Sequence, residues 1–129
     1  MTRRALALVA IPATLALGAA SRLWPLGWHV WDKSVGDVAY AMLLGFVLAA
    51  LWPRVRAPVV GVVTALACFA IELFQLTGIP RRLPRLLHIA LGDTFAWHDV
   101  ACYVVGALVV VLVLRAGERV GCAHGHAPR

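Results

Sequence analysis

Residues 98–114 read HDVACYVVGALVVVLVL, which begins with a histidine and an aspartate and is apolar from there to its end. A helix needs about 20 mostly apolar residues to cross the hydrocarbon core of a bilayer. Three other apolar runs of comparable length lie at residues 5–20, 35–52 and 58–77. The sequence therefore predicts four membrane-spanning helices.

The composition also indicates a membrane protein. Hydrophobic residues make up 62% of the chain and the mean hydropathy is +0.85, whereas roughly half of a soluble domain is apolar. Backbone groups in lipid must be bonded internally, and no alternation of polar and apolar residues indicates a barrel. We predict an all-α fold, an integral membrane four-helix transmembrane bundle of residues 1–116, followed by a flexible tail at residues 117–129.

The first apolar run has a second interpretation. Its basic start MTRR, its apolar middle and the small residues LGAAS are also typical of a secretory signal peptide. Pro12 would in addition kink a helix at this place. The sequence leaves open whether this first span is retained.

The formal net charge of +6 is explained by arginines that flank the spans and contact anionic lipid headgroups. Membrane lipids are therefore the predicted partners, and no nucleic acid is expected. With four spans, seven basic residues lie on the side of the two termini and five on the other side. The positive-inside rule then places both termini of this multi-pass protein in the cytoplasm.

The stretch CFAIELFQLTGIPRR, residues 68–82, places Glu72 and Gln75 inside an apolar run. An ionised acid at the centre of a span costs about 2.5–3.5 kcal/mol on insertion scales, and less near an end. The spacing of three residues puts both side chains on one helix face, which normally turns toward the bundle interior. An arginine of the following loop is the expected partner of Glu72, because a guanidinium can hold a carboxylate through two hydrogen bonds.

Most acidic residues are expected at one end of the bundle, on the side opposite the termini. These residues are Asp32, Asp37, Glu72, Asp93 and Asp99, and only Glu118 lies on the other side. One interpretation is a structural clasp, and the other is a polar pocket that takes a lipid headgroup or another envelope ligand. A proton path is less favoured because the acids lie at one level. Asp37 and Asp99 would also suit the N-terminal ends of helices.

The loop GIPRRLPRLLHIALGDTFAW, residues 78–97, is too long and too apolar for a simple turn. Pro84 fits the first turn of a short helix and Gly92 fits its end. The sequence therefore predicts a short interfacial helix between spans three and four, with leucines in the membrane surface and arginines at the water side. A re-entrant segment is the alternative.

Four segments, LGAASR at 17–22, VGDVAYAM at 35–42, IELFQLTGIP at 71–80 and LGDTFAWHDVACYVVG at 91–106, form a fairly specific set. Together they resemble the bacterial domain of unknown function 2809 family, which is distantly similar to VanZ-like membrane proteins. The resemblance runs along most of the chain and implies a cell-envelope protein with no known reaction. The motif positions that it implies are Arg22, Gly36, Asp37, Glu72, Gln75, Gly92, Phe95, Trp97, Asp99, Tyr103 and Gly106. It also implies a loop arginine, for which Arg82 and Arg85 compete.

Signals for catalysis or metal binding are weak. Ser21 and Ser34 lack a nucleophile motif, and the three cysteines lack an evident base partner. The tail has Cys122 and two histidines, which are too few and too loosely held for a zinc or copper site. We therefore predict no catalytic residue, no metal and no cofactor.

These observations favour a non-enzymatic envelope protein that binds a lipid or lipid-linked headgroup at a polar cluster on its outer-leaflet side. The predicted binding residues are Arg22, Asp37, Glu72, Gln75, Arg82, Arg85 and Asp99. The alternatives are a structural or accessory subunit with a membrane-protein partner and, less favoured, a membrane enzyme acting on a lipid substrate.

Overall fold

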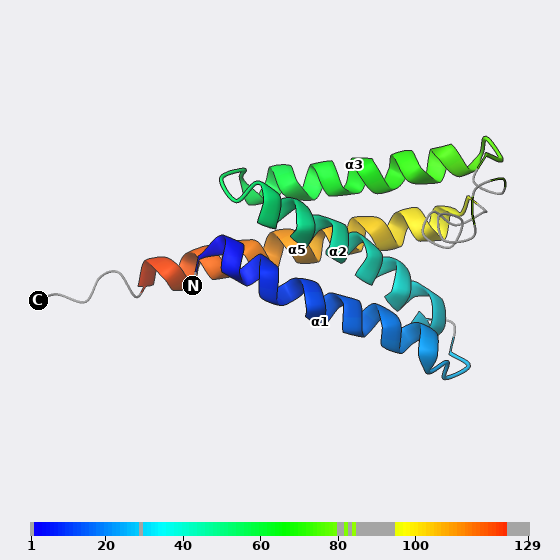
Figure 1. Cartoon of the computed structure of the whole chain (residues 1–129), viewed down its shortest axis with the longest axis horizontal. Helices are drawn as coiled ribbons and strands as arrows, with labels where there is room; N and C mark the ends of the chain where they lie inside the picture. Colours follow the sequence, from blue (N-terminus) through cyan, green and yellow to red (C-terminus); the bar gives the residue numbers. More distant parts are fainter. Residues whose placement is uncertain (1, 29, 80–81, 83, 85–94, 124–129) are drawn as a thin grey trace, which may run out of the picture.

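The computed structural model describes residues 2–28, 30–79, 82, 84 and 95–123, with side chains as far as residue 120. Within these residues lie four helices that are long and apolar enough to cross a membrane, which confirms the predicted all-α class. They are α1 (Arg3–Leu23), α2 (Gly36–Leu51), α3 (Ala57–Gln75) and α5 (Trp97–Ala123), and a short π-helix, η1 (Val30–Val35), precedes α2 (Figure 1).

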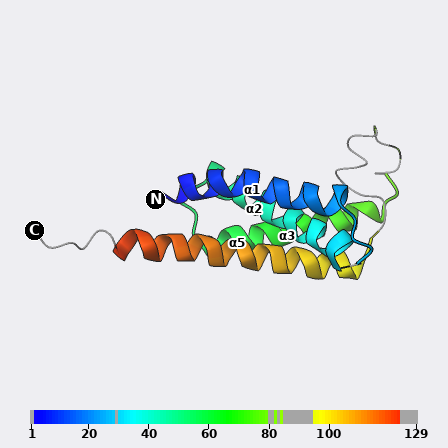
Figure 2. The ribbon, with the colours of Figure 1, turned by 90° about the horizontal axis from the view of Figure 1, so that it is seen from below.

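The helices pack side by side with α2 and α5 at the centre. α1 packs mainly on α2, and α3 packs mainly on α5, so that α1 and α3 flank the central pair (Figure 1). The N-terminus and the end of α5 lie at one end of the molecule, as Figures 1 and 2 show. The connection from α1 to α2 and the start of α5 lie at the other end, where the polar side chains described below gather.

Close contact between the central helices depends on small residues. A Cβ added at Gly106 of α5 would lie 2.6 Å from the carbonyl oxygen of Val38 and 2.7 Å from Cβ of Ala41, both in α2. A Cβ at Gly45 of α2 would lie 2.8 Å from a methyl group of Val110. Glycine lets helix backbones approach closely in membranes, where packing replaces much of the hydrophobic driving force.

Apolar side chains cover much of the outer surface. Leu8, Leu66 and Leu112, from three different helices, are exposed. Trp24 and Trp97 are exposed at the end of the bundle with the polar side chains, and Trp52 is exposed where α2 ends. Apolar helix surfaces with tryptophan near the helix ends are typical of membrane-spanning helices.

Helix α5 continues beyond the apolar run that predicted it. The run ends at Leu114, whereas the helix ends at Ala123. Hydropathy marks the part of a helix that suits lipid, and residues such as Ala, Arg and Glu continue a helix well in water. Arg3 at the start of α1 pairs with Glu118 on this extension at 3.5 Å.

The predicted interfacial helix between spans three and four is not seen among the described residues. Most of the segment on which it was predicted, residues 85–94, lies outside them. The described chain resumes at Phe95, two residues before α5 begins.

Candidate functional site

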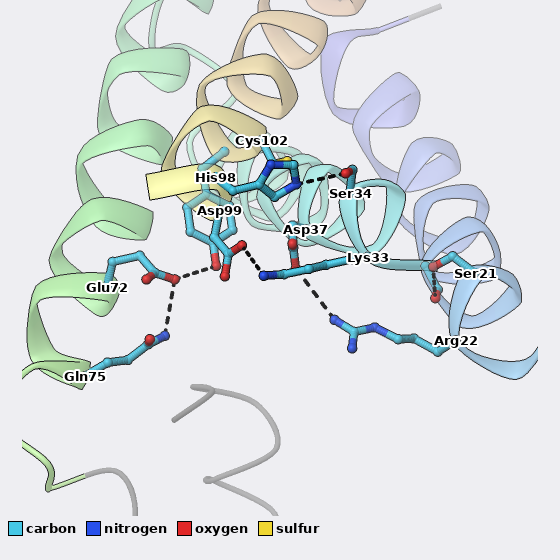
Figure 3. Close-up of polar contacts among 12 residues, drawn as sticks. Ser21, Arg22, Lys33, Ser34, Asp37, Glu72, Gln75, His98, Asp99 and Cys102 are labelled. Carbon is cyan, nitrogen blue, oxygen red and sulfur yellow. Dashed lines mark hydrogen bonds and ion pairs between the residues drawn. The ribbon is translucent and has the colours of Figure 1, made fainter. Parts of the chain in front are cut away.

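One end of the bundle holds a group of charged and polar side chains that every long helix supplies (Figure 3). We call this group the polar cluster. Its members are Arg22 of α1, Lys33 of η1, Asp37 of α2, Glu72 and Gln75 of α3, and Asp99 of α5. The structure thus brings together five of the predicted binding residues from segments far apart in the sequence.

Glu72 is fully buried and accepts three hydrogen bonds from the residues that the structure describes. Its Oε1 accepts from the Tyr103 hydroxyl at 2.8 Å and from Nε2 of Gln75 at 3.2 Å, and its Oε2 accepts from the backbone N–H of Ala96 at 3.4 Å. Tyr103 and Ala96 belong to α5 and to the residue before it, so these contacts join the end of α3 to the start of α5. Burial of a carboxylate is tolerated when donors satisfy it in this way.

The arginine predicted beside Glu72 is not among these partners. Arg82 is exposed, and Arg85 lies outside the described residues. The structure therefore does not choose between the two arginines. Sequence reasoning placed Tyr103 among the motif positions of the family but did not assign it to Glu72.

Arg22 pairs with Asp37 across the ends of α1 and α2, with Nη2 and Oδ1 3.6 Å apart. The side chain of Arg22 is 65% exposed and that of Asp37 is 11% exposed. Gly36 leaves room for this pair, because a Cβ there would lie 3.0 Å from Nε of Arg22. Among the described residues the second carboxylate oxygen of Asp37, Oδ2, is buried without a hydrogen-bond partner.

Lys33 pairs with Asp99 at 3.0 Å and thereby joins η1 to α5. The Lys33 side chain is 42% exposed and the Asp99 side chain is 13% exposed. Sequence reasoning counted Lys33 only as a charge that sets topology. Its position four residues before Asp37 was a signal that Lys33 lies near the predicted binding residues, but this spacing does not indicate the pairing with Asp99.

A second contact between η1 and α5 lies next to this ion pair. The hydroxyl of Ser34 lies 2.9 Å from Nε2 of His98, and the thiol of Cys102 lies 3.5 Å from the same nitrogen (Figure 3). Consecutive residues of η1 thus meet consecutive residues of α5, and His98 and Asp99 face different partners. In the described part of the chain, no group of three or more His, Cys, Asp or Glu residues could hold a metal ion.

The remaining acidic residues have other positions. Asp32 accepts a hydrogen bond from the backbone N–H of Leu26 at 2.8 Å and so holds the connection between α1 and η1. Glu118 pairs with Arg3 near the two chain ends. Asp93 lies outside the described residues.

Comparison with known proteins identifies a family. A family model described as "Protein of unknown function (DUF2809)" matches residues 26–107, which confirms the resemblance found in the sequence. The matched segment contains every member of the polar cluster except Arg22. No curated protein and no solved structure matches the chain.

Proposed function

The chain belongs to the DUF2809 family of proteins of unknown function, and we propose that this member binds the phosphate-bearing headgroup of a lipid or lipid-linked molecule at the polar cluster. The observation that carries the proposal is a pair of exposed cations, each held by a nearly buried carboxylate. Asp37 holds Arg22 and Asp99 holds Lys33.

This arrangement keeps each cation beside a carboxylate and leaves much of its side chain exposed. The Arg22 side chain is 65% exposed and the Lys33 side chain is 42% exposed, so a ligand can reach both. A guanidinium has five N–H donors and an ammonium has three, so each cation can contact a carboxylate and a phosphate together. Arginine in particular binds phosphate through paired hydrogen bonds.

The position of the cations also suits a headgroup. The exposed rings of Trp24 and Trp97 lie at the same end of the bundle, and tryptophan favours the headgroup level of a bilayer. We place this end in the outer leaflet of a bacterial inner membrane, because more basic residues accompany the two termini than the polar cluster.

Glu72 and Gln75 have a supporting role in this proposal. Their contacts hold α3 against α5 and so fix the start of α5, which carries Asp99. Arg82 is exposed on the connection that follows α3 and is a further candidate for phosphate contact, as is Arg85.

The test is lipid retention by the purified full-length protein and its variants. We would reconstitute the protein in nanodiscs that contain phosphatidylcholine and phosphatidic acid, and count the lipids retained by native mass spectrometry. Arg22→Gln and Lys33→Gln should each weaken retention of phosphatidic acid by about tenfold, as loss of a charge-assisted hydrogen bond implies. Arg54→Gln, an exposed arginine between α2 and α3, is the matched control and should retain lipid like the wild type.

A competition experiment and a search for bound partner proteins distinguish a lipid ligand from the alternatives. Addition of inorganic phosphate should not release the lipid if the acyl chains contribute, whereas release would assign the site to free phosphate. Equal lipid retention by the wild type, Arg22→Gln and Arg54→Gln would contradict the proposal. A stoichiometric membrane-protein partner without bound lipid would favour the accessory-subunit alternative.

A further inference from the structure

The polar cluster contains more carboxylates than cations among its described members. Asp37 pairs with Arg22 and Asp99 pairs with Lys33, while Glu72 is held by neutral donors (Figure 3). A simple phosphate placed between the two cations would meet Asp37 as a like charge, because this carboxylate lies beside Arg22. A ligand with positive charge next to its phosphate would therefore complement the described members of the cluster better than a simple phosphate does.

One carboxylate oxygen identifies where this positive charge would bind. Oδ2 of Asp37 is buried and has no hydrogen-bond partner among the described residues. A buried acceptor without a donor carries a desolvation cost, which a donor from a ligand removes. Only 8% of Asp37 is exposed, so this acceptor lies inside the polar cluster and not on the open surface.

The contact between Arg22 and Asp37 is loose. The 3.6 Å separation between Nη2 of Arg22 and Oδ1 of Asp37 exceeds the 2.7–2.9 Å typical of a charge-assisted hydrogen bond. The largely exposed Arg22 side chain can therefore turn toward a phosphate without breaking a tight contact. A ligand whose phosphate draws Arg22 away from Asp37 would then need a donor of its own for this carboxylate.

We propose that the headgroup bound at the polar cluster is zwitterionic, with a protonated primary amine that donates to Asp37 and a phosphate that contacts Arg22 and Lys33. Phosphoethanolamine has this chemistry. The inference rests on the proposed function and adds the ligand class to it. An ammonium is favoured over a neutral hydroxyl because its charge also offsets the excess of carboxylates.

The test uses lipids that differ only in the donor. The full-length protein is reconstituted with equal amounts of phosphatidylethanolamine, phosphatidylcholine and phosphatidylglycerol with matched acyl chains, and bound lipids are counted by native mass spectrometry. The number of phosphatidylethanolamine molecules retained should be about tenfold higher than that of phosphatidylcholine, because the trimethylated nitrogen of phosphatidylcholine has no N–H donor. It should also be preferred to phosphatidylglycerol, which offers only hydroxyl donors.

A pair of variants assigns the preference to Asp37. Asp37→Asn should lose the preference for phosphatidylethanolamine, and Asp32→Asn, which removes an acid at the same end of the bundle, should keep it. Equal retention of the three lipids by the wild type, or an unchanged preference in Asp37→Asn, would overturn the inference. If Asp37→Asn does not accumulate, the comparison of the three lipids on the wild type decides.

The two proposals fail in different ways. If Arg22→Gln lowers the retention of all three lipids but the wild type shows no preference among them, only the zwitterionic ligand is wrong. If Arg22→Gln retains every lipid as the wild type does, the headgroup site itself is wrong.

Discussion

Glu72 shows how one buried carboxylate can organise a helix pair in a membrane protein. Three donors from α3, α5 and the residue before α5 converge on its two oxygens, so the cost of burying it is offset locally. No cation is needed for this among the described residues. The carboxylate acts as an acceptor that fixes how the end of α3 sits against α5.

The hydroxyl of Tyr103 makes the shortest of these hydrogen bonds, and its removal should lower the stability of the protein measurably. Tyr103→Phe leaves Oε1 of Glu72 with one donor fewer in a buried site, which costs about 1–3 kcal/mol. We expect a lower thermal midpoint for the variant in detergent than for the wild type. Tyr40→Phe is the matched control, because the Tyr40 ring lies beside Tyr103 and its hydroxyl has no partner in the described part of the chain. Equal midpoints for both variants would remove the role assigned to Tyr103.

Glu72→Gln distinguishes a structural role of Glu72, which joins α3 to α5, from direct contact of Glu72 with a ligand. The amide has the size of the carboxylate but presents a donor where the native oxygens only accept, so one of the three donors is left facing another donor. We expect reduced stability and reduced accumulation in the membrane, while the protein that does fold still retains lipid. Glu118→Gln, at an ion pair in which the Glu118 side chain is 48% exposed, should lower stability less than Glu72→Gln does. Normal accumulation of Glu72→Gln with lost lipid would show that Glu72 contacts the ligand.

The sequence predicts which helices exist better than it predicts how they contact one another. Hydropathy predicted the four helices because each must match the thickness of a bilayer. It did not predict η1 or the extension of α5 to Ala123, because neither depends on a run of apolar residues. The segment of the predicted interfacial helix lies largely outside the described residues.

The candidate site was predictable only in part. Counting spans places Arg22, Asp37 and Asp99 at one end, since each lies beside the end of an apolar run. The pairing of Lys33 with Asp99 and of Tyr103 with Glu72 depends on how each helix is rotated about its axis. That rotation follows from side-chain packing between helices, which a single sequence does not reveal.

The contact between α2 and α5 offers a test at the scale of the helices. Gly106→Ala places a methyl group against the backbone oxygen of Val38, so the helices must separate, and overpacking of this kind costs about 1–3 kcal/mol. We expect a lower thermal midpoint and less folded protein in detergent. Gly18→Ala is the control, because its Cβ would meet Cβ of Ala39 at an ordinary 3.4 Å and alanine favours the helix. A midpoint for Gly106→Ala at or above that of Gly18→Ala would show that this contact is not close.

For the whole molecule, the polar cluster is a property of the assembled fold. Each of the four long helices contributes a member or its partner, and η1 supplies Lys33 between them (Figure 3). No pair of helices alone holds both cations together with their carboxylates. Conditions that separate α1 from α2 should therefore release Arg22 from Asp37 and weaken lipid binding before the contact between α3 and α5 is lost.

The orientation of the bundle in the membrane gives the last prediction. The connections that carry Leu26 and Ile79 adjoin the end with the polar cluster, while Arg54 lies in the connection from α2 to α3 at the other end. Single cysteines at these positions, in a chain whose native cysteines are serine, can be probed with a membrane-impermeant maleimide. Leu26→Cys and Ile79→Cys should react in intact cells, and Arg54→Cys only after permeabilisation, because the proposed orientation puts the termini inside. The reverse pattern would invert the orientation and keep the fold, whereas labelling of Leu26→Cys and Ile79→Cys from opposite sides would exclude the shared site, since α1 and α3 would then end in different leaflets.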